Sequence, residues 1–242
     1  MANVLITGGA GFIGSSLCYN LSQNKHKIWT IDNLSTGKIE NIPKKIIFIN
    51  LPCESKKILE HFKNIKLDAI IHIAGQSSGE ISFENPIKDL KSNTASTLNL
   101  LNLSKLTNCK RFIYASSMSV YGNSIKQPVN EIQICKPLSF YGVGKLASEN
   151  YIKLFNNYEI NWTIFRLFNI YGPGQNLDNL KQGMISIYLS QLIKNNKIVV
   201  KGSNKRFRDF VFIDDLVNIF KKLLNNKDSY NQVINLGTGK KT

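Results

Sequence analysis

The sequence NVLITGGAGFIG, at residues 3–14, decides the fold because it joins a short apolar strand to a helix through a glycine-rich turn. Its glycines follow the pattern G-x-x-G-x-x-G. Gly8 permits the tight turn, Gly11 lets the backbone approach a pyrophosphate, and Gly14 lets the helix pack closely on the sheet. The N–H groups at the start of the helix attract phosphates, so the pattern predicts a dinucleotide-binding turn.

Asp32 supports this interpretation because it closes the second predicted strand, residues 27–31. A carboxylate at this place can accept hydrogen bonds from the adenosine ribose hydroxyls of NAD. It would repel the extra 2′-phosphate of NADP, so the predicted cofactor is NAD. The alternative is that Asp32 only caps the turn formed by residues 32–35.

Beyond this turn, short β-branched runs alternate with longer helical stretches, which predicts a parallel sheet with crossover helices. We expect strands at residues 3–7, 27–31, 46–49, 69–73, 111–116, 162–168 and 233–236. We expect helices at residues 11–22, 90–105, 144–155 and 213–224. The alternation loosens at Tyr171, where a loop-rich segment begins. The expected fold class is therefore α/β, with a Rossmann-type doubly wound parallel sheet.

The 242-residue chain has an ordinary globular composition, with 43% hydrophobic and 19% charged residues. That balance excludes a disordered polar chain, a collagen-like repeat and a small disulfide scaffold. No apolar run reaches the roughly 18 residues of a membrane span. The start, MANVLITGG, has none of the regions of a signal peptide. We therefore expect a cytoplasmic protein that does not bind membranes.

The charge is less ordinary, since 31 Lys and Arg against 16 Asp and Glu give a formal net charge of +15. Clustered cations favour nucleic acid, but these lysines are scattered, and most stand in pairs or beside Asn. We expect no nucleic-acid partner, although a basic field would favour a small molecule that carries a diphosphate. The four cysteines form no CxxC motif and the three histidines have no ligand spacing, so no metal site is predicted.

A candidate catalytic pair is formed by Tyr141 and Lys145, which share one face of a helix because they are four residues apart. A neighbouring ammonium stabilises a phenolate, so Tyr141 could act as a general base near neutral pH. Ser117 follows the fifth predicted strand, at the carboxyl edge where open α/β sheets bind ligands. The alternatives are a surface contact between Tyr and Lys and an ordinary serine-rich loop.

Six segments together carry a family resemblance: TGGAGFIG, DNLSTG, HIAG, SSMSVYG, YGVGK and RLFNIYGPGQ. In this order and spacing they resemble the extended short-chain dehydrogenase/reductase family. Within that family the chain is most similar to NAD-dependent nucleotide-sugar epimerases of the UDP-glucose 4-epimerase type. The resemblance covers essentially the whole chain, and no single motif decides it.

The resemblance implies an NAD-binding Rossmann domain at residues 1–170. Residues 171–242 would form a small, incomplete substrate-binding lobe, with elements that return to the first domain. It implies a catalytic triad in which Ser117 assists the base Tyr141, while Lys145 binds the nicotinamide ribose and lowers the pKa of Tyr141. The cofactor-binding residues that it implies are Gly8, Gly11, Phe12, Ile13, Gly14, Asp32, Asn33, Ala74, Gly75, Gln76, Asn93, Tyr141 and Lys145.

The implied reaction is epimerisation of a nucleotide sugar, at C4 of a UDP-hexose, through a transient 4-keto intermediate. The implied substrate-binding residues are Ser117, Tyr141, Asn169 and Arg208. Arg208 would pair with the diphosphate, because a guanidinium fork suits phosphate geometry. The alternative for Arg208 is a salt bridge with Asp209 or another nearby acid.

Related activities leave some alternatives open. Sugar-nucleotide dehydratases of the family place an Asp-Glu pair directly after the active-site hydroxyl residue, where this chain has Met118 and Ser119. Decarboxylating relatives usually keep a Glu at the second of these positions. The sequence therefore favours epimerisation over dehydration and decarboxylation, while epimerisation at C2 stays open because it uses the same triad.

Two departures from the family pattern give a second class of hypothesis. Residues 49–53 lack the Gly-Asp pair whose Asp contacts adenine in many relatives, and relatives continue beyond Thr242. The alternative is therefore a catalytically idle NAD-binding remnant. Relatives dimerise through a four-helix bundle, here expected from the helices at residues 90–105 and 144–155, so we expect a homodimer.

Overall fold

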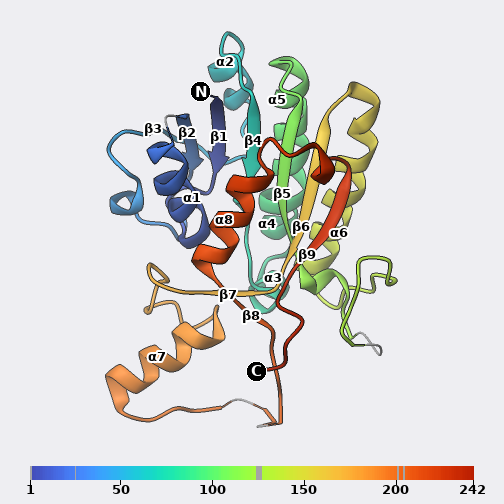
Figure 1. Cartoon of the computed structure of the whole chain (residues 1–242). Helices are drawn as coiled ribbons and strands as arrows, with labels where there is room; N and C mark the ends of the chain where they lie inside the picture. Colours follow the sequence, from blue (N-terminus) through green and yellow to red (C-terminus); the bar gives the residue numbers. More distant parts are fainter. Residues whose placement is uncertain (1, 25, 124–126, 201, 204) are drawn as a thin grey trace.

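A computed structural model of the chain describes residues 2–24, 26–123, 127–200, 202–203 and 205–242. Its centre is a parallel sheet of seven strands in the order β3-β2-β1-β4-β5-β6-β9 (Figure 1). The strands are β1 Asn3–Thr7, β2 Lys27–Asp32, β3 Ile47–Asn50, β4 Ala69–His72, β5 Arg111–Ser117, β6 Asn161–Leu167 and β9 Gln232–Leu236. The strand order reverses between β1 and β4, which confirms the predicted Rossmann-type fold.

Helices cover both faces of the sheet, which explains why the strands are nearly continuous apolar runs. In β1, Val4 and Ile6 point to one face and Leu5 to the other, because side chains alternate along a strand. The first face is covered by α1, Phe12–Gln23, and α8, Ile213–Leu223. Apolar residues of α8 and of the sheet therefore share one core although they lie far apart in the sequence.

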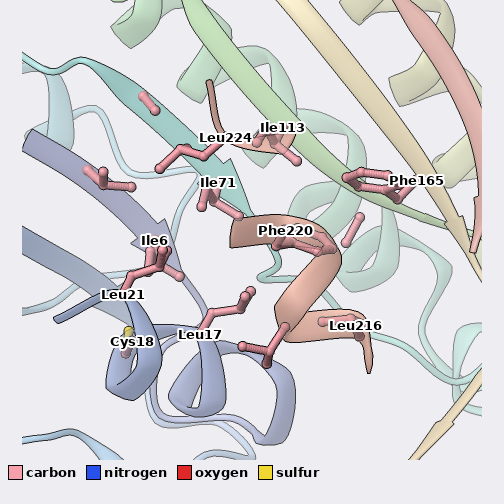
Figure 2. Close-up of a cluster of buried hydrophobic side chains, with 14 of the residues drawn as sticks. Ile6, Leu17, Cys18, Leu21, Ile71, Ile113, Phe165, Leu216, Phe220 and Leu224 are labelled. Carbon is pink, nitrogen blue, oxygen red and sulfur yellow. The ribbon is translucent and has the colours of Figure 1, made fainter. Parts of the chain in front are cut away.

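That shared core is drawn in Figure 2, where Leu17 of α1 and Phe220 of α8 lie with Ile71 and Phe165 of the sheet. The rings of Phe165 and Phe220 have centroids 4.8 Å apart. The opposite face has its own core, built against α2, α5 and α6. These helices span Lys57–Phe62, Ser96–Leu106 and Phe140–Leu154.

Two helices differ from the prediction at places that matter for the site. The predicted helix at residues 90–105 is three elements: α4 Pro86–Leu90, a π-helical turn η2 Lys91–Ala95, and α5. The last predicted helix before β6 begins at Phe140 rather than at residue 144. Ser139 caps it by accepting a hydrogen bond from the Gly142 N–H (3.1 Å), so Tyr141 lies in the first turn.

The remaining elements lie at the edges of the sheet. A two-stranded parallel sheet joins β7, Asn169–Tyr171, to β8, Phe210–Phe212, and α7, Met184–Asn195, projects beyond the carboxyl ends of the large sheet (Figure 1). The short helices are η1 Ile39–Asn41, α3 Gly79–Glu84, η3 Met118–Val120, η4 Phe155–Tyr158 and η5 Lys227–Ser229. None of β7, β8, α2, α3 and α7 was predicted. Within the residues that the structure describes, no helix is both long and apolar enough for a membrane span.

Candidate active site

The glycine turn after β1 has the geometry that the sequence predicts. Gly8 has a φ of +75°, and its N–H donates to the Ile31 carbonyl (2.8 Å) while its carbonyl accepts from the Gly11 N–H (3.1 Å). A Cβ atom on Gly14 would stand 2.0 Å from the Gly8 carbonyl oxygen, so no side chain fits there. No side chain caps the start of α1 and its first turn has no acidic residue, which suits the binding of a phosphate.

Asp32 holds the glycine turn and caps its own turn at the same time. Its Oδ2 accepts a hydrogen bond from the Ala10 N–H (3.0 Å), and its Oδ1 accepts one from the Leu34 N–H (2.8 Å). Each carboxylate oxygen can still accept a further bond, as ribose hydroxyls require. Asn33 is exposed next to it, with its side-chain oxygen accepting from the Ser35 N–H (3.1 Å).

A hollow of about 280 Å³ lies beside the glycine turn. It is lined by Ala10, Gly11, Phe12, Thr36, Lys38, Asn41 and residues 174–178. Sequence reasoning missed Lys38 and Asn41. The Lys38 backbone N–H (3.1 Å) and the Asn41 side-chain amide (2.9 Å) both donate to the Ala10 carbonyl. A second hollow of about 330 Å³ lies at the amino edge of β5 and β6 and contains none of the predicted site residues.

The loop after β4 forms a second wall next to the glycine turn. A Cβ atom on Gly8 would stand 3.0 Å from the backbone of Ala74, so the two segments touch. The Gln76 side chain is occupied within the loop, since its Nε2 donates to the Ser78 carbonyl (2.7 Å) and to Asp89 Oδ1 (2.8 Å). The loop can therefore line a cofactor with the backbone of residues 74–76, and not with the Gln76 amide.

Asn93 braces this wall from the π-helical turn. It is fully buried, and its Nδ2 donates to the Gln76 carbonyl (3.0 Å) and to Asp89 Oδ1 (3.1 Å). Its Oδ1 is buried with no hydrogen-bond partner among the described residues, and a Cβ atom on Gly75 would stand 2.4 Å from it. The absence of a side chain at Gly75 therefore leaves room for this unpartnered acceptor behind the loop after β4.

The three predicted catalytic residues come together where β5 ends and α6 begins. All three are buried, and Lys145 Nζ donates to the Ala115 carbonyl (2.9 Å) and lies 5.7 Å from the centroid of the Tyr141 ring. The Ser117 hydroxyl accepts from the Ser119 N–H (3.1 Å) and donates to the Ser119 hydroxyl (3.2 Å). The surface Tyr–Lys contact is therefore excluded for these two side chains.

Burial shifts the pKa values of both Tyr141 and Lys145. Burial raises the pKa of Tyr141 to about 12, against the hydrogen-bonding effect of Ser117. Burial lowers the pKa of Lys145 to about 8, although the negative charges of Asp89 and Glu149 oppose that change. Burial therefore favours the neutral phenol of Tyr141, and the lowering of its pKa by Lys145 stays a prediction.

The predicted substrate residues flank the same edge. Asn169 begins β7, and its Nδ2 donates to the Asp209 carbonyl (2.9 Å) and contacts Met118 Sδ (3.8 Å), which places it beside the segment after Ser117. The Asp209 carboxylate accepts from the N–H groups of residues 238 and 239 (2.9 and 2.7 Å). None of the ion pairs among the described residues joins Arg208 to Asp209.

The Arg208 guanidinium has donors left for a ligand, because the hydrogen bond that its side chain makes within the described residues uses one terminal nitrogen. One of its terminal nitrogens donates to the Phe207 carbonyl (2.8 Å), and the backbone of Arg208 pairs with that of Thr242 in both directions (2.9 Å each). Partial burial and the positive charge of Arg206 lower the pKa of Arg208. A bound anion would relieve both effects, as a diphosphate does.

A buried ion pair behind the triad was not predicted. Arg166 of β6 donates to Glu149 of α6 through Nε (3.1 Å) and through a terminal nitrogen (2.8 Å). The Ser116 hydroxyl also donates to Glu149 (2.5 Å), and Arg166 donates to the Tyr121 hydroxyl (2.9 Å). The sequence offered one signal for a buried acid here: Glu149 follows Lys145 by four residues, so both lie on the same face of the helix.

Comparisons with known proteins agree with this geometry. The family described as the NAD dependent epimerase/dehydratase family matches residues 4–237. A Methanocaldococcus jannaschii protein, provisionally named a UDP-glucose 4-epimerase, is 36% identical over 241 residues, which cover 99% of this chain and 78% of that relative. The crystal structure of UDP-glucose 4-epimerase from Thermotoga maritima with UDP-glucose is 33% identical, with a TM-score of 0.95 over 99% of this chain and 78% of that one.

Another activity also occurs among the relatives. UDP-glucuronic acid decarboxylase 1 of Xenopus tropicalis is 32% identical over 240 residues, which cover 97% of this chain. This chain spans 56% of the length of that relative. Similarity alone therefore does not separate epimerisation from the other reactions of such proteins.

Proposed function

Because this chain belongs to the NAD dependent epimerase/dehydratase family, we propose that it epimerises a nucleotide sugar, at C4 of a UDP-hexose, through a 4-keto intermediate. Relatives named as UDP-glucose 4-epimerases, which are isomerases, support this choice among the reactions of the family. The observation that carries the proposal is the convergence of Ser117, Tyr141 and Lys145 at the carboxyl edge of the sheet, the edge at which the glycine turn also lies. Residues 1–170 would hold the cofactor and residues 171–242 the sugar nucleotide.

The chain's own groups divide the work as follows. Tyr141 takes the proton of the sugar 4-hydroxyl and later returns it, and Ser117 hydrogen-bonds the reacting oxygen. Lys145, fixed on the Ala115 carbonyl, presents its remaining N–H groups to the cofactor ribose. When bound, NAD would supply the acceptor and the donor of the C4 hydride, so none would be consumed. Burial favours the neutral form of Tyr141, so a positive charge beside its hydroxyl would help to form the phenolate.

Arg208 and Asn169 would hold the substrate from the lobe side. A partly buried guanidinium with few protein acceptors suits a diphosphate. Asn169 lies beside η3, so it can reach the sugar while Ser117 contacts the reacting oxygen. A sugar nucleotide bound across this edge would contact both parts of the chain, which orients C4.

Met118 and Ser119 favour epimerisation over dehydration or decarboxylation. Elimination of water needs an acid and a base next to the active-site hydroxyl, and the side chains here are a thioether and a hydroxyl. The Ser119 hydroxyl accepts a hydrogen bond from Ser117, so it serves the triad instead. Epimerisation at C2 uses the same triad and is an outcome of the test below.

The test is to incubate the purified chain with UDP-glucose, UDP-galactose and their N-acetyl forms, with and without added NAD. We expect interconversion of the 4-epimers, and none with Tyr141→Phe. If no sugar nucleotide turns over while NAD still raises the melting temperature, the chain is an idle NAD-binding protein. Release of a keto-deoxy sugar or of carbon dioxide, or epimerisation at C2, would assign one of the other reactions.

We also propose a homodimer formed through α4, α5 and α6. Each helix carries apolar side chains that are more than half exposed: Ile87 and Leu90 on α4, Leu106 on α5, and Val143 and Leu154 on α6. Pairing of two such faces would bury this apolar surface in a four-helix bundle. Sedimentation equilibrium should give twice the chain mass for the native protein and a monomer for Leu154→Arg, whereas a native monomer would refute the proposal.

A further inference from the structure

His72 is a fully buried polar residue that the mechanism does not use. It ends β4, where it pairs in register with Thr7, the residue before the glycine turn. Its Nδ1 lies 2.8 Å from the Thr7 hydroxyl, and its Nε2 lies 3.2 Å from the Thr97 hydroxyl of α5. His72 therefore links the strand that leads into the glycine turn to α5, which follows the π-helical turn.

The positions of the protons in this cluster follow from its hydrogen bonds. Thr7 Oγ1 accepts from the N–H groups of Ile73 and Ala74 (3.1 Å each), which uses both of its lone pairs. Its own proton must then go to His72 Nδ1. The ring is therefore bare at Nδ1 on this side.

The other side of the ring is equally determined. The Thr97 hydroxyl gives its proton to the Asn93 carbonyl (2.7 Å), so toward the imidazole it can only accept. The more distant Ser96 hydroxyl (3.4 Å from Nε2) also gives its proton to a backbone carbonyl, that of Ser92 (2.6 Å). His72 must therefore donate from Nε2, which makes it a neutral ring with a single tautomer.

The surroundings oppose a second proton on the ring. The Tyr114 ring lies 5.4 Å from the His72 ring, and Lys145 Nζ lies 4.8 Å from the centroid of Tyr114, so an imidazolium would face an ammonium across one aromatic ring. Burial and the charge of Lys145 hold the pKa of His72 well below its usual range. A protonated ring would also lose the bond from Thr7, because Nδ1 could no longer accept it.

We propose that His72 is a positioning residue that holds the loop after β4 and the π-helical turn in place beside the glycine turn, through a chain of hydrogen bonds from Ala74 to Asn93. On one side it orients the Thr7 hydroxyl, which holds the loop after β4 against Gly8. On the other side it holds Thr97, which secures the π-helical turn that presents Asn93. This proposal rests on these walls binding NAD, as proposed above.

The first test is the nitrogen NMR spectrum of the imidazole rings, which is simple because the chain has three histidines. His26→Gln and His61→Gln variants assign the signals. We expect the His72 ring to show a protonated Nε2 and a bare Nδ1, unchanged from about pH 5 to 8. A proton on Nδ1, or a doubly protonated ring at neutral pH, would overturn the proposal whether or not NAD binds.

The second test is the dissociation constant for NAD, measured by calorimetry. We expect it to rise about tenfold in His72→Phe, the factor that about 1.4 kcal/mol produces, and to be partly restored in His72→Gln, which keeps a donor and an acceptor. Thr97→Val should raise it about threefold, since a buried donor loses a partner. The matched control is His61→Phe, at an exposed histidine, which should leave it unchanged.

The outcomes separate this inference from the proposed cofactor site. If His72→Phe does not fold, Thr97→Val and the tautomer of the native ring decide. Unchanged affinity for NAD in folded His72→Phe and Thr97→Val, with a clear loss in Gly14→Ala, would refute the positioning role alone. Unchanged affinity for NAD in Gly14→Ala as well would refute the proposed cofactor site at the glycine turn.

Discussion

Glu149→Gln is the perturbation that tests the packing behind the triad most sharply. Glu149 is fully buried, and the Arg166 side chain that it binds is nearly so. The substitution keeps the size and shape of the side chain but removes its charge. Arg166 is then left with a buried positive charge that only neutral groups contact, the Tyr121 hydroxyl and the Glu131 carbonyl (2.9 and 3.2 Å).

The expected loss in the free energy of unfolding follows from that geometry. Removing one partner of a buried ion pair costs about 3–5 kcal/mol, because the other charge stays desolvated without its counter-charge. Domains of ordinary stability have about 5–15 kcal/mol in total. The melting temperature should therefore fall by roughly 10 °C in a chain of this size. The Glu149→Met, Arg166→Met double variant should lose less than the single one, since no charge stays buried.

The assay is urea unfolding followed by the fluorescence of Trp29 and Trp162, which both belong to the core on the α5 face. A shift of the midpoint with an unchanged slope reports a change in stability. The matched control is Glu159→Gln, in the exposed ion pair with Lys110, where the midpoint should not move measurably. A loss below about 1 kcal/mol for Glu149→Gln, at unchanged slope, would refute the reasoning from buried charge.

Four further results are expected. Tyr141→Phe should lower kcat at least about 100-fold, the scale of a general base, while calorimetry shows NAD still bound. Gly14→Ala should weaken NAD binding about tenfold or more in the same measurement, because its Cβ would stand 2.0 Å from the Gly8 carbonyl oxygen and push the phosphate-binding turn aside. Arg208→Met should raise KM for the sugar nucleotide about tenfold and leave the affinity for NAD unchanged, since a charged hydrogen bond to phosphate is lost. The free energy of unfolding should fall by up to about 1.4 kcal/mol per pH unit below pH 6.5. The reason is that His72 binds a proton in the unfolded chain but not in the folded one, where its pKa is lowered. Urea titrations from about pH 5 to 7 should show a smaller dependence on pH in His72→Phe.

The sequence predicts the parts of the fold that depend on local rules. The glycine turn follows from steric limits within a few residues, and the structure reproduces it at Gly8 and Gly14. The strands of the large sheet are apolar because helices cover both faces, so their composition reveals them. The start of α6 was placed too late because glycines at 142 and 144 hid it, although Ser139 is an ordinary cap.

The parts that were missed depend on contacts between distant segments. β7 and β8 have three residues each, too few for a periodic pattern, and only Val211 among them is buried. The π-helical turn at Asn93 cannot be told from regular helix by its composition, and it is visible only where its side chain meets the loop after β4. His72 stood in a quoted motif without a role, because its function lies in partners 65 and 25 residues away in the chain.

The electrostatics of the site explain why the catalytic pair is built into the core. A phenol whose pKa burial raises to about 12 is a poor base at neutral pH, and the hydrogen-bonding effect of Ser117 offsets only part of that rise. Yet Lys145 is itself destabilised as a cation, because burial lowers its pKa to about 8 against the opposing negative charges of Asp89 and Glu149. A bound cofactor that offers Lys145 a hydrogen-bond acceptor and places a positive charge beside Tyr141 would offset both effects of burial. On the proposed mechanism, Tyr141 would then be a competent base only when the hydride acceptor is in place, and the sugar would not lose a proton without hydride transfer.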